Sequence, residues 1–398
     1  MKNKEEERIL RRISTAELER RWKAVRLAMA EKKLDFLLIQ NSTDYFGGYV
    51  KWFTDVSPVH QYPVTVLFSK DNGMTTIWHG TQAPADPSPP AWLLRGVRKR
   101  ISMPFLPPLE YTSHYEAEKI VEELRPLGKC RIGFVNMGSM SAAFYKYVTE
   151  HLTAAHFENA TDLVDEIKAI KSPEEIELIR EVCRIQDTAF ECTLPKIQAG
   201  RRDYEIYAEV KAKCAEMGST QQLVIGGSFP YGTRGRLLDS FVGNRVLEEG
   251  DQFNLLIENN GPSGMYAHLF CIVCLGKAPQ ALLEQFEIAT EAQKHILNLL
   301  RPGADSVELW DANNEFLTSR GFEKEGRIFA HGQGYDLVER PSFNPGETMK
   351  VKANMNIAVH PCVISKNTYA EVCQNFLVPE SGPPERLHKT PQRVFIND

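Results

Sequence analysis

Several features that would assign this sequence to a large class of proteins are missing. It contains no run of about 18 apolar residues, so it offers no candidate membrane span. Its formal net charge is −5 over 398 residues, which argues against the basic surface of a nucleic-acid-binding protein. The first residues, 1–7, are charged and lead into no apolar segment, so we expect no secretory signal.

Cysteine is present, but not in a disulfide pattern. The eight cysteines are scattered among apolar residues of a long chain, which favours reduced thiols in a cytoplasmic protein. Cys271 and Cys274 form a Cys-x-x-Cys, but strand alternation sends their thiols to opposite faces. With 42% hydrophobic and 25% charged residues, the chain is long enough for two domains with sizeable cores.

The first part of the chain alternates between helical and strand patterns. Ser14 and Glu17 form a capping box ahead of apolar residues at helical spacing. The remaining patterns predict strands at 35–40 and 131–135, a hairpin of strands at 63–68 and 74–78, and a helix at 115–124. This alternation indicates an α/β domain.

A strong helix start marks the domain boundary. Ser172 can cap a helix, Pro173 suits its first position, and Glu175 completes a capping box. Apolar residues then recur on one face of the predicted helix. We therefore expect one domain over 1–164 and a second over 165–398.

The segment 329–341 carries the main chemical signal. Gly332 and Gly334 follow His331, and Glu339 stands just before a proline. Glycine lets backbone approach a ligand closely, and a neighbouring histidine can present its imidazole to a pocket. The spacing alone is a weak indication of a site.

Together, segments 165–176 and 329–341 resemble motifs of the pita-bread family, which includes creatinase, aminopeptidase P and prolidase (peptidase family M24). The resemblance extends over nearly the whole chain. It implies an α/β (α+β) fold, with a creatinase-like α/β domain over 1–164 and a pita-bread catalytic domain over 165–398. It also implies a homodimer.

Metal-dependent members of that family hold two divalent ions with two Asp, one His and two Glu. Hard carboxylate oxygens suit such ions, which activate a water molecule. The corresponding positions of this chain are held, in order, by Glu258, His268, His331, His360 and Cys373. Of the family ligands, therefore, only the histidine is kept unchanged. Glu371 stands two residues before Cys373, and alternation predicts both on the same face of one strand.

Two interpretations of this altered pocket compete, beside a third in which it is inactive. In the first no metal binds, as in creatinase, and side chains alone perform acid–base chemistry. In the second, one zinc or iron ion is bound by His268, His331, His360 and Cys373, whose nitrogen and sulfur atoms suit zinc.

The first interpretation gives each residue a catalytic role. His331 or His268 is the general base or acid, with Glu339 tuning it, and His360 stabilises developing charge. Cys373 is either a nucleophile activated by an imidazole or a packed thiol.

Candidate substrate-binding residues are Tyr231, Arg234, Glu258 and Glu371. Arg234 can bind a carboxylate through a bidentate fork, although a solvated loop arginine is an equally good interpretation. No histidine occurs between His156 and His268, and creatinase uses one in that region. Creatine is therefore a poor substrate candidate.

We expect a hydrolase that cleaves a C–N bond of a small molecule without a dinuclear metal centre. The alternatives are a lyase resembling dimethylsulfoniopropionate lyase and an enzyme with a mononuclear metal site. A true Xaa-Pro peptidase and a non-catalytic binding module are less favoured. The expected protein is cytoplasmic, with no nucleic-acid or membrane partner.

Overall fold

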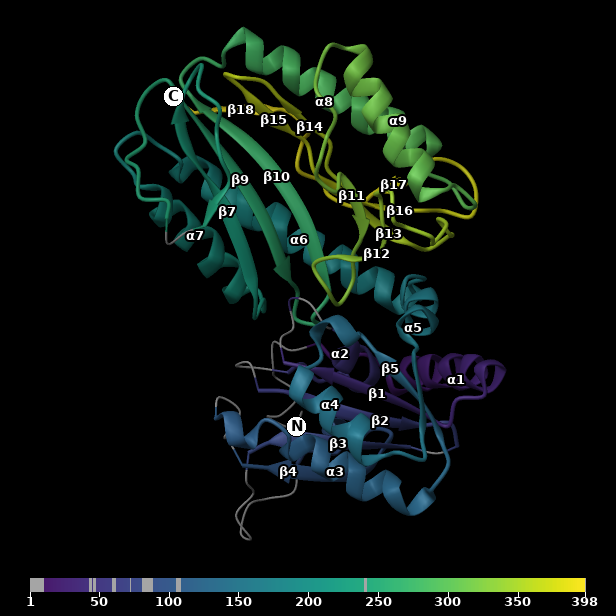
Figure 1. Cartoon of the computed structure of the whole chain (residues 1–398). Coiled ribbons are helices and arrows are strands. Elements are labelled where there is room, and N and C mark those ends of the chain that lie inside the picture. Colours follow the sequence, from purple (N-terminus) through teal and green to yellow (C-terminus); the bar gives the residue numbers. More distant parts are fainter. Residues whose placement is uncertain are drawn as a thin grey trace. The chain divides into compact units, whose positions relative to one another are not determined.

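The computed structural model describes residues 11–42, 45, 48–58, 62–71, 73–80, 89–104, 109–239 and 242–397. Two compact units make up the chain, Arg12–Lys168 and Ala169–Asp398, and Arg11 belongs with the second (Figure 1). The predicted division after residue 164 falls inside helix α5 (Thr161–Lys168), and the units divide after that helix. The expected lack of a leader concerns residues 1–7, which lie outside the described residues.

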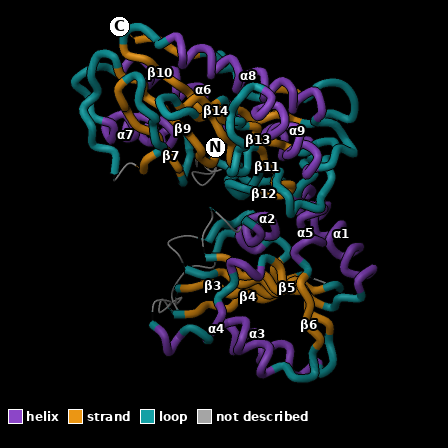
Figure 2. Tube along the Cα trace, turned by 45° about the horizontal axis from the view of Figure 1, so that its top comes forward, coloured by secondary structure: helices purple, strands orange, loops and turns teal. Residues whose placement is uncertain are grey.

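The first unit is built on one mixed sheet with helices on both faces. Its strands are β1 (Phe36–Asn41), β2 (Val64–Ser69), β3 (Met74–His79), β4 (Val97–Met103), β5 (Arg131–Val135) and β6 (His156–Asn159), in the order β4-β3-β2-β1-β5-β6. Its longer helices are α1 (Thr15–Lys32), α2 (Tyr49–Thr54), α3 (Tyr115–Leu124), α4 (Ala142–His151) and α5. Figure 2 shows α3 and α4 on one face of the sheet and α1, α2 and α5 on the other.

Local sequence signals predicted this unit well. The helix expected at 115–124 is α3, and the strand expected at 131–135 is β5. The predicted hairpin is the antiparallel pair β2 and β3. Ser14 caps α1, because its Oγ accepts a hydrogen bond from Glu17 N at 3.1 Å. Each of these elements depends on neighbours in sequence, which explains why pattern alone found them.

Two further sheets, each covered by a pair of helices, make up most of the second unit. The first sheet has the order β18-β10-β9-β7-β8 and packs against α6 and α7. The other has the order β12-β11-β13-β16-β17 and packs against α8 and α9, while β14 and β15 form a small ribbon (Figure 1). The bounds are α6 (Pro173–Thr193), α7 (Asp203–Glu216), β7 (Gln222–Pro230), β8 (Leu238–Asp239), β9 (Asp251–Asn260), β10 (Tyr266–Leu275), α8 (Gln280–Leu299), α9 (Ser306–Ser319), β11 (Ala330–Gly332), β12 (Glu339–Ser342), β13 (Asn356–Val359), β14 (Cys362–Ile364), β15 (Tyr369–Glu371), β16 (Gln374–Leu377), β17 (Glu385–Arg386) and β18 (Val394–Asn397).

Short 3₁₀ turns connect several of these elements. They lie at Ala91–Leu94, Glu110–Thr112, Arg125–Leu127, Met137–Ser139 and Leu194–Lys196. The capping box predicted at the start of α6 is confirmed: Ser172 Oγ accepts from Glu175 N at 3.2 Å, and Glu175 Oε2 accepts from Ser172 N at 2.8 Å. All eight cysteines are free. Cys271 packs in the core beneath α6 and α7 and Cys274 in a separate cluster, as alternation predicted.

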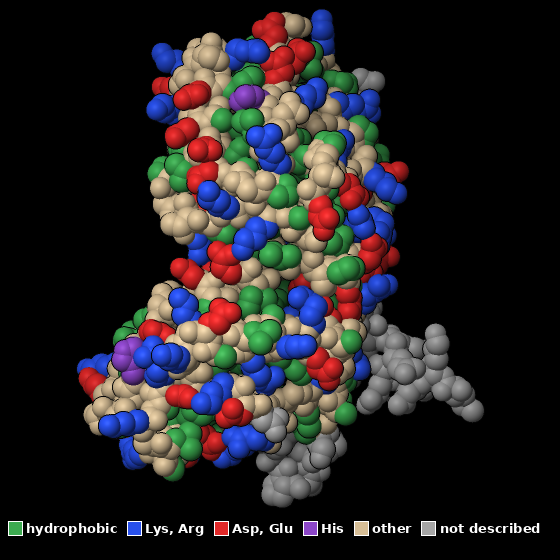
Figure 3. Space-filling model, turned by 90° about the vertical axis from the view of Figure 1, so that its right-hand side faces the viewer, with side chains coloured by type: hydrophobic (Ala, Val, Ile, Leu, Met, Phe, Trp, Pro, Cys, Tyr) green, Lys and Arg blue, Asp and Glu red, His purple; other side chains and the backbone are tan. Residues whose placement is uncertain are grey.

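Charges of both signs share the surface. On the face drawn in Figure 3, lysine and arginine side chains are interspersed with aspartate and glutamate. That mixture agrees with the slightly acidic net charge and gives this face no basic field. Across the part of the chain that the structure describes, no helix combines the length and the apolarity needed to cross a membrane.

One buried side chain ties helix α6 to the hairpin of β9 and β10. Gln186 Nε2 donates to Ile257 O at 3.0 Å and to Ala267 O at 2.6 Å. Its Oε1 lies 2.8 Å from His388 Nε2, so the amide is used at both ends. Since these carbonyls are buried, losing their donor leaves unsatisfied polar groups in the interior.

Replacing Gln186→Leu should therefore lower the free energy of unfolding by about 1–3 kcal/mol, the cost of orphaned buried polar groups. Urea unfolding followed by circular dichroism measures the change. Gln198→Leu is the matched control, because that side chain is exposed, and it should leave stability nearly unchanged. Equal stability of the two variants would show that the bridge contributes nothing.

Candidate active site

The antiparallel pairing of β9 with β10 positions the first two site residues. In this register Glu258 lies directly opposite His268. Both side chains are buried, and Glu258 Oε1 is 3.8 Å from His268 Nδ1. That distance is longer than a hydrogen bond, so the two groups are neighbours without being bonded.

The other two histidines come from the second large sheet. His331 lies in β11, which pairs with β13, and His360 follows directly after β13. His331 Nδ1 donates to Gly332 O at 2.8 Å. In a neutral ring this bond fixes the proton on Nδ1 and leaves the lone pair of Nε2 available. His360 is held by its backbone, whose N–H donates to Phe329 O at 2.7 Å.

Histidines 268, 331 and 360 converge on one point of the interior. Each offers a ring nitrogen, and these atoms all lie within 4.8 Å of one another. The ring centre of His360 is 5.1 Å from those of His268 and His331. All three side chains are buried, and neither ring nitrogen of His268 or His360 makes a hydrogen bond. Buried polar atoms without partners are rare in proteins and call for a ligand or another explanation.

Burial keeps these imidazoles neutral. It lowers the pKa of His331 to about 4, and it lowers the pKa values of His268 and His360 well below the usual range. Both pKa values are lowered further by His331 and Arg327, and that of His360 also by His268. Near pH 7 the site therefore presents imidazole lone pairs, the form in which histidine binds metal ions.

Two buried carboxyl groups flank the histidines. Burial raises the pKa of Glu258 to about 8 and also raises the pKa of Glu371. Glu371 Oε1 is 3.9 Å from His360 Nδ1 and makes no hydrogen bond, while its Oε2 accepts from the hydroxyl of Tyr369. Arg327 Nη1 lies 3.6 Å from the same oxygen. Each of His268 and His360 thus faces one carboxyl group.

A chain of amide side chains links the two sheets beneath the site. His268 N donates to Asn375 Oδ1 at 2.7 Å, and Asn375 Nδ2 donates to Gln333 Oε1 at 2.8 Å. Gln333 Nε2 then donates to Glu258 Oε1 at 2.8 Å. Sequence reasoning did not identify Gln333, Asn375 or Arg327 as site residues. The position of Gln333 inside His-Gly-x-Gly was an available signal, whereas nothing local marked the other two.

Glu339, expected to tune His331, mainly holds the loop after it. Its Oε2 accepts from Lys171 Nζ at 2.5 Å, and its Oε1 accepts from Tyr335 N at 2.7 Å. A Cβ atom at Gly334 would lie 2.6 Å from Glu339 Oε1 and 2.7 Å from Lys171 Nζ. The second glycine of the motif is therefore required by this buried ion pair. Glu339 still favours the protonated form of His331, but the effect is smaller than that of burial.

Cys373 lies next to the cluster but is not one of the three converging residues. Its Sγ is 3.6 Å from His268 O, and burial raises the pKa of the thiol well above its usual range. The expected single strand is interrupted, since β15 ends at Glu371 and β16 begins at Gln374. The continuous strand expected through both residues is therefore not observed, although Glu371 still raises the pKa of Cys373. Cys373 packs in an apolar cluster as a thiol.

Tyr231 and Arg234 lie away from the histidines, which corrects their expected place in the site. Tyr231 OH donates to Leu275 O at 3.0 Å, at the far end of β10 from His268. At roughly 3.3 Å per residue, the strand separates these ends by about 23 Å. Arg234 follows three residues later in the chain, and its side chain is exposed.

The donor set decides which ions suit this pocket. A pair of hard ions bridged by carboxylates needs more oxygen ligands than remain near the three imidazoles. Three neutral nitrogen donors with carboxyl groups beside them instead fit one zinc or iron ion. The partnerless ring nitrogens of His268 and His360 provide the structural reason to expect such an ion.

Comparisons with known proteins agree with this architecture. The model of metallopeptidase family M24 matches residues 177–380. The Xaa-Pro dipeptidase of Pyrococcus furiosus is 24% identical over 307 residues, covering 73% of this chain and 85% of that protein. The ectoine hydrolase of Halomonas elongata is 23% identical over 403 residues, covering 95% and 96%. A solved X-Pro aminopeptidase from Thermotoga maritima has a TM-score of 0.77 at 18% identity, covering 94% and 99%, and shows the same pita-bread fold.

The Lys171–Glu339 pair yields a test of how the His331 loop is held. Lys171→Met leaves the Glu339 carboxylate buried without that cation, which should cost about 3–5 kcal/mol of unfolding free energy. Adding Glu339→Gln should recover much of the loss, because the uncompensated charge disappears. Lys277→Met is the control, since Lys277 is exposed. Urea unfolding of the wild type, Lys171→Met, the double variant and Lys277→Met measures these changes. A Lys171→Met variant as stable as Lys277→Met would contradict the stabilising role of the ion pair.

Proposed function

Because the chain belongs to metallopeptidase family M24, we propose that it is a hydrolase that cleaves a C–N bond of a small molecule at a site holding one divalent metal ion. His268, His331 and His360 are the ligands. The relatives with the most complete coverage include an ectoine hydrolase, so hydrolysis is the reaction class with the best support. Attack of water on a carbonyl or amidine carbon followed by release of nitrogen is the proposed chemistry.

The convergence of three ring nitrogens within 4.8 Å of one another carries this proposal. A metal-free mechanism needs an imidazole that accepts a proton near neutral pH. Burial instead lowers the pKa of His331 to about 4 and makes His268 and His360 still poorer bases. Neutral imidazoles that are weak bases in water remain good metal ligands. The observed geometry therefore favours the mononuclear site over side-chain chemistry alone.

The chain's own residues divide the remaining work. When bound, the ion supplies Lewis acidity and lowers the pKa of a bound water. Burial raises the pKa of Glu258 to about 8, and the charge of a bound ion would lower it again. The carboxyl group can therefore take a proton from the attacking water and deliver it to the leaving nitrogen. Gln333 fixes the orientation of that carboxyl group by donating to Oε1. Glu371 lies beside His360, with its Oε1 3.9 Å from Nδ1, and Tyr369 and Arg327 hold the carboxyl group in place.

The first prediction from this proposal concerns metal content. Purified protein reloaded with zinc or ferrous iron should hold about one ion per chain, since three imidazoles define one site. His331→Ala and His360→Ala should each reduce the content to near zero, as measured by elemental analysis after gel filtration. His295→Ala is the control, because that ring stacks on Phe316 away from the cluster. A folded wild-type protein that retains no ion would contradict the metal site and support a mechanism that uses side chains alone.

A second prediction separates ion binding from proton transfer. Glu258→Gln should keep the ion but lower turnover by about 10²- to 10⁴-fold, the usual effect of losing a general acid. The control is Glu291→Gln, which removes a carboxylate paired with Arg320 near the surface. This variant should keep both the bound ion and the wild-type turnover. Assays begin with Xaa-Pro dipeptides and ectoine and extend to small amides, guanidino acids and cyclic amidines. Product mass distinguishes the reaction classes: addition of water supports hydrolysis, whereas an unsaturated product without it indicates elimination.

A further inference from the structure

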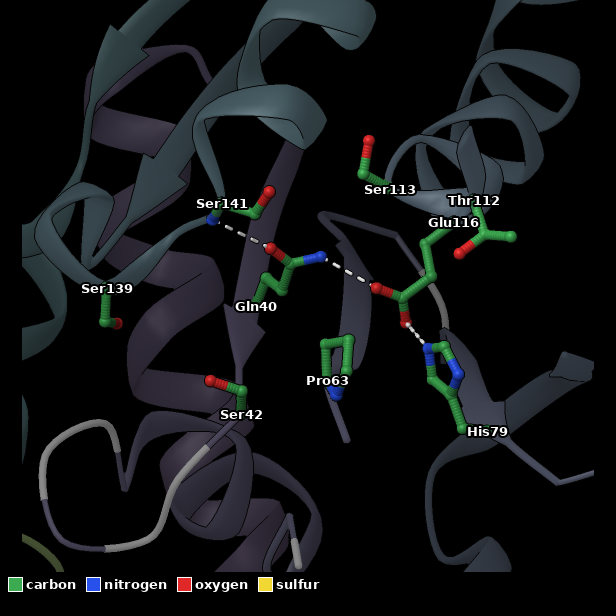
Figure 4. A pocket seen from close by; sticks show the side chains of 9 residues that line it. All are labelled: Gln40, Ser42, Pro63, His79, Thr112, Ser113, Glu116, Ser139 and Ser141. Atoms are coloured by element: carbon green, nitrogen blue, oxygen red, sulfur yellow. Dashed lines mark hydrogen bonds and ion pairs between the residues drawn. The ribbon is translucent and has the colours of Figure 1, made fainter. Parts of the chain in front are cut away.

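A second polar cavity lies in the first unit and plays no part in the proposed hydrolysis. It has a volume of about 250 Å³, and its described lining includes Gln40, His79, Glu116 and five hydroxyl side chains (Figure 4). It opens at the carboxyl ends of the parallel neighbours β1 and β5. In open α/β sheets this is the edge at which ligands usually bind.

Gln40 fixes the floor of this cavity. Its Oε1 accepts from Ser141 N at 3.1 Å, and its Nε2 donates to Glu116 Oε2 at 2.8 Å. These two bonds, drawn in Figure 4, determine which end of the amide faces the carboxyl group. Both side chains are more than nine-tenths buried. The site is therefore constructed from interior side chains and not from mobile surface groups.

His79 contributes a second acceptor beside Glu116. Its Nδ1 lies 3.2 Å from Pro104 O, which can only accept, so in a neutral ring the proton is on Nδ1 and Nε2 carries a lone pair. Nε2 is 3.5 Å from Glu116 Oε1, and neither of these buried atoms makes a hydrogen bond. With His79 neutral and Glu116 ionised, this contact, drawn as a dashed line in Figure 4, brings together two adjacent acceptors that have no donor between them.

The charges around the cavity favour a donor over an anion. No lysine or arginine is among its described lining residues, and Glu116 is the acidic one. The nearby start of α4 is capped by Ser141, whose Oγ accepts from Phe144 N. The first turn of α3 already carries Glu116 and Glu118. An anion in the cavity would therefore lie beside the Glu116 carboxyl group. The N-terminal ends of α3 and α4 would not attract it strongly, because Glu116, Glu118 and the Ser141 cap already satisfy them.

We propose that this cavity binds a small ligand with an amidinium or primary ammonium group, which donates N–H bonds to Glu116 Oε1 and His79 Nε2. The hydroxyl side chains then bind the polar remainder of the ligand. Burial raises the pKa of Glu116, so its ionised form is costly until a cation lies beside it. A bound cation offsets that cost and satisfies both orphaned acceptors, which neither a neutral amide nor an anion does.

Three probes of the same planar shape test this proposal on the full-length protein: acetamidinium, acetamide and acetate. They present donors only, a mixture, and acceptors only. Saturation-transfer NMR on the probe methyl group should give binding in the order acetamidinium, then acetamide, with none for acetate. Glu116→Gln should weaken acetamidinium binding at least about tenfold, because it removes a charge-assisted hydrogen bond. Glu118→Gln, on the same helical turn but outside the cavity, should leave it unchanged.

Ser113→Leu provides a second, independent variant. Its side chain lines the cavity, and filling that space should abolish acetamidinium binding without touching the Gln40–Glu116 bond. Circular dichroism checks that each variant is folded. If Glu116→Gln does not fold, the effect of Ser113→Leu on acetamidinium binding tests the proposal alone. Acetate binding as well as acetamidinium would overturn the proposal. So would acetamidinium binding that survives Ser113→Leu.

Discussion

The register between β9 and β10 is the constraint on which the candidate active site depends. It sets Glu258 opposite His268 within a strand pair that is buried along its whole length. Because side chains alternate between faces, a slip of one strand by one residue would place the two groups on opposite faces of the sheet. The same strand is joined to the other half of the unit, since His268 N donates to Asn375 and Phe270 forms a bridge with Cys373. The backbone thus fixes the position of one imidazole relative to the other two.

Desolvation gives that site its electrostatic character. It lowers the pKa of each imidazole and raises the pKa values of Glu258 and Glu371, so both kinds of group are pushed towards their neutral forms. A pocket in that state carries little charge but many lone pairs. A divalent ion would reverse the balance, because its charge favours ionised carboxylates beside the ligands. If the proposed ion binds, its binding would therefore be linked to proton release.

The sequence predicted local structure far better than long-range partnership. Ser172, Pro173 and Glu175 defined the start of α6 because a capping box involves only near neighbours. The motif around His331 pointed to the correct loop, but its second glycine, Gly334, is explained by the ion pair of Glu339 with Lys171, 168 residues away in sequence. Cys373 was assigned from its position in the family motif, and alternation then placed Glu371 beside it on one strand, but the strand is interrupted between Glu371 and Gln374. Tyr231 was near the β9 turn in sequence but at the wrong end of a long hairpin. Each error concerns contacts between residues far apart in the sequence, which local sequence patterns do not reveal.

Both units place a buried carboxyl group beside an imidazole, and the numbers of donors and acceptors determine what each pair can bind. Around His268 the surplus consists of imidazole nitrogens from three converging rings, and those of His268 and His360 have no hydrogen-bond partner among the described residues. A single metal ion with several coordination positions could accept a nitrogen from each ring at the same time. Around His79 there is one ring and one carboxyl oxygen, too few ligands for an ion but correctly spaced for a group with two N–H bonds. Under the two proposals, the same residue types would bind a metal ion in one unit and a hydrogen-bond donor in the other, because recognition follows the count of unsatisfied atoms and not the residue names.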